Sequence, residues 1–174
     1  MFQIYSDGIE GIICIFVAYT SALFYPSDEI VRQIFTSTAR MRLLENGIVH
    51  YSYLPNAEID YEQQVENTHA FCQLLKERRY PLLFDGGELV NYSNKARFYI
   101  RKHEEDLPIL CRAFVTKSLI NRININLYYL IHRSAIPHKV FNEYSEAVTW
   151  LLEMKAKYDA YPGDGHPEDI LMNN

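Results

Sequence analysis

The 174-residue sequence is poor in several residue types, and each shortage argues against a class of protein. Its three cysteines, Cys14, Cys72 and Cys111, lie far apart and form no CxxC pair, which argues against a disulfide framework and against a zinc site. Seven glycines and seven prolines are too few for a collagen-like or linker-dominated chain. Seventeen basic residues against 22 acidic ones give a net charge of −5, so the long-range field repels phosphate backbones and we expect no nucleic-acid partner.

Long hydrophobic runs are also scarce. The charge-free run at residues 11–25 (GIICIFVAYTSALFY) is shorter than the roughly 18 to 20 residues that a membrane-spanning helix needs. The residues before it carry Asp7 and Glu10 and no basic residue, which is the wrong charge for a secretion signal. We therefore predict a cytoplasmic protein with no membrane span. An apolar fraction of 48% indicates a globular chain.

The N-terminal part of the chain predicts a small β/α extension. Residues 2–5 and 12–19 are two short β-like runs, separated by turn residues. Ser27 or Asp28 can cap a short helix that continues through Phe35. We expect this extension to occupy residues 1–39.

A hairpin follows the extension. Residues 40–44 and 48–53 flank a turn that contains Asn46 and Gly47, and Asn-Gly supplies the positive φ angles that a tight hairpin turn requires. After the hairpin, helical and strand-like segments alternate, a pattern typical of parallel strands joined by right-handed crossovers. We therefore predict an α/β fold, with helices packed on an open mixed sheet.

Caps and hydrophobic spacing locate the segments of this alternation. Asp60 caps a helix over residues 61–79, and Ser93 caps the next helix. The expected core face of the first helix is Tyr61, Val65, Thr68, Cys72 and Leu75, with Phe71 beside them, and that of the third is Leu119, Ile123, Leu127 and Leu130. The remaining predicted segments are strands at 82–84, 109–116 and 138–141, helices at 94–103, 118–132 and 145–158, and a C-terminal tail at 159–174.

Residues 40–155 resemble the small STAS-like domains, which include the anti-sigma-factor antagonists and the lipid-binding SEC14-type group. The likeness covers about two-thirds of the chain, and the resemblance implies a STAS-like (SpoIIAA-like) domain over residues 40–158. It also implies a non-catalytic, regulatory role in bacteria. The segments that carry it are RMRLLENGIVHYSY, PLLFDGGELVNYSNKARFYI and INLYYLIHRSAIPHKVFNEYSEAVTWLLEMK.

The resemblance also implies a switch surface. In the phosphoregulated antagonists, a strand that ends in Asp leads through a loop to a helix whose first turn carries a phosphorylatable Ser or Thr. Here the strand ends at Asp85, the acceptor position falls on Asn94, and Ser93 lies one residue earlier. A helix N-terminus stabilises added negative charge, and Lys95 is close in sequence. Ser93 is therefore either a phosphorylation site or a plain helix cap.

A second candidate surface is basic. His132, Arg133, His138 and Lys139 surround Pro137 and could form a rim that receives an anion or an acidic partner. The alternative is an ordinary solvated loop, because loops are usually polar.

Metal-binding and catalytic patterns are weak. The run at 103–106 (HEED) points in diverging directions on a helix, so we interpret it as a solvated helix end. The acidic residues and histidine at 164–169 have no rigid frame around them. The sequence contains no GxSxG, HExxH or Gly-rich phosphate loop. We therefore expect no metal, no cofactor and no catalytic residues.

The chain has fourteen tyrosines and nine phenylalanines, which are more aromatic residues than are needed to cover a small sheet. Tyr51 and Tyr53, and also Tyr128 and Tyr129, are either core residues or part of a self-association or apolar-ligand surface. The preferred hypothesis is an interaction module that binds a protein partner and forms a homodimer. The alternatives are a small carrier of a lipid or other apolar ligand, and an enzyme whose site is assembled from distant residues.

Overall fold

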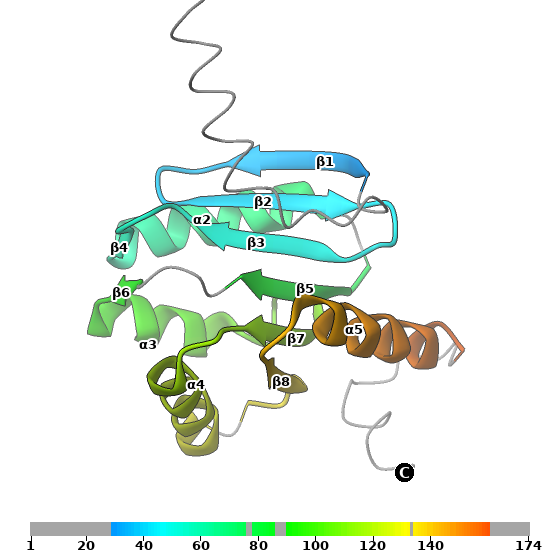
Figure 1. Ribbon diagram of the computed structural model, residues 1–174. Coiled ribbons are helices and arrows are strands. Elements are labelled where there is room, and N and C mark those ends of the chain that lie inside the picture. Colours follow the sequence, from blue (N-terminus) through cyan, green and yellow to red (C-terminus); the bar gives the residue numbers. More distant parts are fainter. Residues whose placement is uncertain (1–28, 76–77, 86–89, 133, 161–174) are drawn as a thin grey trace, which may run out of the picture.

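The computed structural model describes residues 29–75, 78–85, 90–132 and 134–160, and these residues form a mixed six-stranded sheet with helices on both faces (Figure 1). The strand order is β1-β2-β3-β5-β7-β8. The strands of this sheet are β1 (Ile30–Phe35), β2 (Ala39–Leu44), β3 (Val49–Tyr53), β5 (Tyr80–Asp85), β7 (Ile109–Val115) and β8 (His138–Phe141). A two-stranded sheet, β4 (Glu58–Ile59) and β6 (Asn91–Tyr92), lies beside it, and the helices are α2 (Tyr61–Leu74), α3 (Asn94–His103), α4 (Leu119–His132) and α5 (Tyr144–Asp159).

The strand pairing confirms the predicted α/β fold with a mixed sheet. The strands β1, β2 and β3 pair antiparallel, whereas β3, β5, β7 and β8 pair parallel. The predicted hairpin is β2 and β3, and Gly47 in its turn has a φ of +82°, a conformation that favours glycine.

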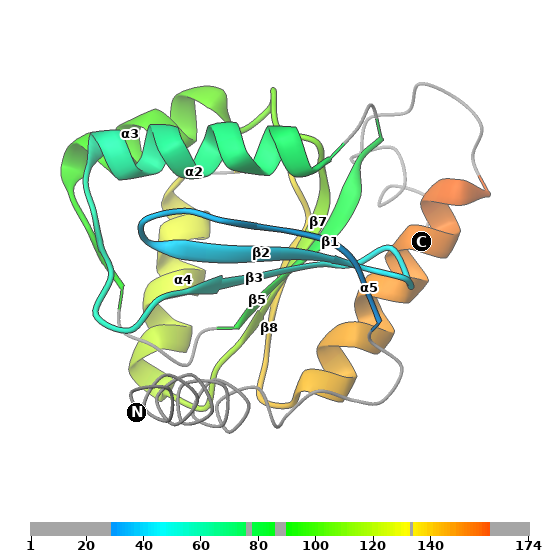
Figure 2. The same ribbon diagram turned by 90° about the horizontal axis from the view of Figure 1, so that it is seen from above.

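The sheet carries a core on each face. On one face Met41, Val49 and Leu82 pack against Phe71 and Leu74 of α2. On the other face Leu83, Leu110 and Ala113 pack against Leu151 and Met154 of α5. Figure 2 shows α2 and α3 on one side of the sheet and α5 on the other. The alternation of strand side chains between two covered faces explains the nearly continuous apolar runs of β5 and β7.

The helix predicted to continue through Phe35 is wrong, because residues 30–35 form the strand β1. This segment is rich in β-branched residues, and Ile34 pairs with Met41 and packs against the core under α2. Strand pairing therefore outweighs the cap signal at Ser27 and Asp28. These two residues and the predicted β-like runs at 2–5 and 12–19 lie outside the described residues. The division of the chain after residue 39 stays a prediction. The strand β1 lies within the predicted extension and pairs with β2 at the edge of the sheet.

The predicted inward face of α2 is wrong in part. Phe71 and Leu75 are buried as expected, but Tyr61 and Cys72 are exposed. The helix is rotated because Asn67, a polar residue that hydropathy assigns to the surface, is buried. Its Oδ1 accepts a hydrogen bond from Thr36 Oγ1 at 2.6 Å, and its Nδ2 donates to Thr38 Oγ1 at 3.0 Å. The side chains that α2 buries are Gln64, Asn67, Ala70, Phe71 and Leu74.

The predicted inward face of α4 points outward. The side chains of Leu119, Ile123, Leu127 and Leu130 are 71%, 63%, 50% and 75% exposed. The inward position is taken by Tyr129, whose ring stacks on His138 at 4.0 Å and lies 5.6 Å from Phe114. The spacing identified a real apolar stripe, but Tyr129 on the opposite side of the helix attaches α4 to the sheet.

Candidate functional site

The N-termini of α2 and α3 are brought together by the small sheet of β4 and β6. These strands are parallel, with Glu58 opposite Asn91 and Ile59 opposite Tyr92. The backbone N–H of Ser93 continues the ladder by donating to the Ile59 carbonyl at 2.9 Å. The residue after β6 is therefore placed beside Asp60, the residue after β4.

Asp60 and Ser93 are the N-caps of the two helices, as predicted, and they also contact each other. Ser93 Oγ accepts from the Ala96 N–H at 3.2 Å and donates to Asp60 Oδ1 at 2.6 Å. Asp60 Oδ1 also accepts from the Tyr61 N–H at 2.7 Å. The bond from Ser93 lowers the pKa of the Asp60 carboxyl, with a smaller contribution from the Tyr61 N–H. A carboxylate of this chain thus occupies the anion-favouring start of the helices.

The structure separates the predicted switch residues into two places. Asn94 and Lys95 are exposed in the first turn of α3, next to Ser93. Asp85 ends β5 on the face that α5 covers, and its Oδ2 lies 4.0 Å from Nε2 of His50. The contact between Ser93 and Asp60 was not predicted, because the strands that create it are only two residues long and give no sequence signal.

An open groove runs along α3 from this junction. Its volume is about 530 Å³, and none of the described side chains that line it is acidic. The ring of Tyr61 from α2 lies edge-on to Tyr99 at 5.5 Å, and the ring of Phe98 is 58% exposed. We call this the α3 groove; its lining residues are Tyr61, Asn94, Lys95, Phe98, Tyr99, Lys102 and His103.

Sequence reasoning missed most of the α3 groove. It predicted the helix at 94–103 but not the groove along it, and Ala96 of this helix is fully buried. The opposite stripe is Lys95, Phe98 and Lys102, at spacings of three and four residues. A phenylalanine between two lysines on an otherwise polar helix face was the signal that could have found it.

The described residues of the predicted basic rim, His132, His138 and Lys139, lie in different surroundings. The ring of His138 stacks on Tyr129, and burial lowers its pKa. Lys139, the next residue of β8, points to the other face and lines an open groove of about 370 Å³ beside α5. His132 lies at the end of α4 with its ring 4.5 Å from that of Tyr128, and Arg133 lies outside the described residues.

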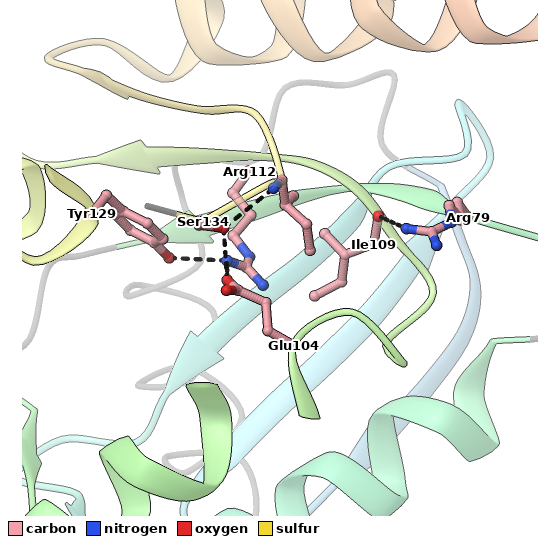
Figure 3. Close-up of polar contacts among 7 residues, drawn as sticks. Arg79, Glu104, Ile109, Arg112, Tyr129 and Ser134 are labelled. Carbon is pink, nitrogen blue, oxygen red and sulfur yellow. Dashed lines mark hydrogen bonds and ion pairs between the residues drawn. The ribbon is translucent and has the colours of Figure 1, made fainter. Parts of the chain in front are cut away.

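A buried charged cluster attaches α3 and α4 to the sheet (Figure 3). Arg112 of β7 donates from Nη1 to Oε1 of Glu104 and, at 3.3 Å, to Oη of Tyr129. Ser134 Oγ donates to the same Glu104 oxygen at 2.9 Å. The side chains of Arg112 and Glu104 are only 4% and 13% exposed. Glu104 is therefore a buried partner of Arg112, which corrects its interpretation as part of a solvated helix end.

Among the residues that the structure describes, no three His, Cys, Asp or Glu side chains are placed to hold one metal ion. None of the helices within the described ranges has the length and the apolar character that crossing a membrane requires.

The fold and its surfaces define an α/β protein with a mixed sheet and surface grooves. The chain belongs to a family described as a domain of unknown function, DUF7793, whose model matches residues 42–155. It is similar to an uncharacterized protein from the DUF3478 family with a SpoIIAA-like fold from Shewanella loihica, with 12% identity and a TM-score of 0.46. That match covers 74% of this chain and 98% of the other. Comparison with curated proteins found no match.

Proposed function

We propose that this chain is a regulatory protein-interaction module of the cytoplasm, and that the α3 groove binds an acidic segment of a partner protein. The observation that carries the proposal is the combination of Lys95 and Lys102 with the exposed ring of Phe98. A basic groove with an aromatic centre stands out on a chain whose net charge is −5. Complementary charge steers such partners together, and aromatic side chains anchor them.

The spacing of the two lysines suggests the form of the bound segment. Lys95 and Lys102 are seven residues apart on one helix, which corresponds to about 10 Å along its axis. Two acidic residues three positions apart in an extended segment are separated by about the same distance. Phe98 and Tyr99 lie between the lysines and offer apolar contact to the residues between those two acids.

Reversing the two lysine charges is expected to abolish partner capture. We expect Lys95→Glu/Lys102→Glu protein to recover at least tenfold less partner from host lysate than wild type, as quantified by mass spectrometry. Capture by wild type should also weaken as salt is raised, because the lysines are exposed. The double variant should remain folded by circular dichroism, since neither lysine belongs to the core.

The matched control for this experiment is Lys117→Glu/Lys157→Glu. Both of these lysines are exposed and line neither groove described above. The control has the same change in net charge, so it separates an effect of the groove from an effect of total charge. If the groove variant and the control recover the same proteins in the same amounts, the α3 groove is not the contact surface.

Ser93 is the position at which we propose that binding is regulated. A phosphate on Ser93 would replace the donor hydroxyl by a dianion next to the Asp60 carboxylate. Repulsion between these anions would weaken the junction that keeps Tyr61 of α2 against Tyr99 of α3. Phosphorylation would thus alter the α3 groove while leaving the sheet intact.

Variants of Ser93 test this junction without phosphorylation. We expect Ser93→Ala to lower the free energy of unfolding by about 1 kcal/mol through the lost cap. Ser93→Asp should be more destabilising than Ser93→Ala, because its carboxylate would lie next to that of Asp60. Urea unfolding at neutral pH measures both. Asp60→Asn should recover stability in the Ser93→Asp background; if it does not, charge repulsion at this junction is the wrong explanation.

The shape of the grooves does not favour the alternative function, a carrier of a lipid or other apolar ligand. A carrier that holds its ligand between helices and sheet needs an enclosed cavity of a few hundred Å³. The α3 groove and the groove beside α5, the two cavities described above, both open to solvent. Their form supports a contact surface for a protein segment.

A further inference from the structure

We infer that α4 is the docking surface for a second copy of this chain. Its outward face carries six large aliphatic side chains, each at least half exposed. A contiguous apolar patch on the order of several hundred Å² is unusual on a monomer and marks an interface. We call this the α4 face; its residues are Leu119, Ile120, Ile123, Leu127, Leu130 and Ile131.

The α4 face is separate from the contacts that hold the helix to the sheet. Tyr129 points inward to His138 and Arg112, and Arg122 donates to Asn142 Oδ1 in the connection between β8 and α5. Figure 1 shows α4 at the periphery, below the strands and α3. None of the side chains of α4 is buried, although the whole helix is described. The aliphatic stripe therefore serves no part of the core described here.

The spacing of the α4 face matches the seam of a helix pair. Ile120, Ile123, Leu127 and Leu130 recur at intervals of three, four and three residues, which are the a and d positions of two successive heptads. Leu119 and Ile131 flank this seam at g and e positions and widen the apolar surface that a partner helix would cover. The occupant that this spacing favours is therefore a helix with the same pattern.

The charge of α4 favours a copy of itself over a charged partner. The e and g positions beside the seam, which set partner choice through their charges, are Leu119, Asn124, Asn126 and Ile131. All four are neutral, and a side-chain amide can both donate to and accept from its own counterpart across a two-fold axis.

A membrane surface is a poor match for the same helix. Helices that lie on membranes are rich in Lys and Arg on their polar face. The ionisable residues of α4 are Arg122, His132 and two tyrosines, and Arg122 is held by Asn142. This assignment is independent of the α3 groove, so each can fail without the other.

Sedimentation of matched variants tests the second copy. We expect wild type at micromolar concentration to sediment with twice the 20.4 kDa mass of one chain. Ile123→Glu/Leu127→Glu and Ile123→Lys/Leu127→Lys proteins should each be monomeric, with the dimer Kd raised at least tenfold. An equimolar mixture of the two should form a dimer again, because opposite charges then meet across the seam. Circular dichroism should show that both are folded.

The control is Leu152→Glu, a half-exposed leucine on α5 that should leave the dimer intact. A wild type that sediments only at 20.4 kDa overturns the inference. So does an Ile123→Glu/Leu127→Glu protein that stays dimeric, because the dimer would then use another surface. If the mixture of the two variants stays monomeric, the α4 face does not meet its own copy, and a different partner covers it.

Discussion

Replacing Glu104 by alanine is expected to lower the free energy of unfolding by about 3 to 5 kcal/mol. The change leaves the guanidinium of Arg112 buried with no carboxylate, and it also removes the acceptor of the Ser134 hydroxyl. A charge that cannot reach water or a counter-charge is costly in an interior. Urea or thermal unfolding monitored by circular dichroism measures the effect, with the wild type measured alongside.

The double variant Glu104→Ala/Arg112→Met separates a missing partner from a damaged fold. Methionine retains much of the packing volume of Arg112 without its charge, so the double variant should recover most of the stability that Glu104→Ala loses. Asp159→Asn provides the control for surface ion pairs, because Asp159 and its two partners, Lys155 and Arg78, are all at least partly exposed; its effect should stay below about 1 kcal/mol. A Glu104→Ala protein within 1 kcal/mol of wild type contradicts the role assigned to this pair.

The pair of Glu104 and Arg112 illustrates why the sequence predicts the positions of turns and helix caps better than it predicts which side chains are buried. The hairpin turn at Asn46 and Gly47 and the caps Asp60 and Ser93 are local signals, because each depends on one or two residues and their own backbone. They were predicted at the positions where the structure has them. Glu104 was misinterpreted because its partner Arg112 lies on a strand and the burial of the pair depends on both.

Helix orientation is likewise a tertiary property. The stripe of Leu119, Ile123 and Leu127 is the most regular apolar pattern of α4, and periodicity alone assigns it to the core. The structure turns the other side toward the sheet, where Tyr129 contacts His138 and Arg112. Apolar periodicity reports that a helix face is to be covered, but it does not report whether the same chain or another one covers it.

Only the start of the candidate site was predicted from the sequence. The start of α3 was proposed from the resemblance, and the α3 groove does begin at Asn94 and Lys95. Its other wall, Tyr61, comes from α2, and no pattern in the sequence connects residues 61 and 99. The parallel bridge of β4 and β6 makes that connection, and a bridge of two residues is too short to produce an alternation.

Acid is expected to destabilise the fold through His50. The ring lies on β3, its Nδ1 is 2.7 Å from Nη2 of Arg42, and its Nε2 is 4.0 Å from Asp85. Because a guanidinium can only donate, Nδ1 accepts and the imidazole is neutral. Burial, with the charges of Arg42 and Arg40, lowers the pKa of His50 to about 3.

The lowered pKa fixes the direction of this pH dependence. The unfolded chain has a normal histidine pKa of about 6.5, so between pH 6.5 and 3 it binds a proton that the folded chain does not. The contribution is fully present above pH 6.5 and is lost as pH falls towards 3, at up to about 1.4 kcal/mol per pH unit. Urea unfolding at pH 7, 6, 5 and 4 should therefore show the wild type losing about 3 kcal/mol more between pH 7 and pH 4 than His50→Gln, which keeps an acceptor for Arg42. His69→Gln, at an exposed histidine of α2, controls for loss of a histidine and should follow the wild-type curve. Parallel curves for wild type and His50→Gln would mean that His50 takes up its proton equally easily in the folded and the unfolded chain.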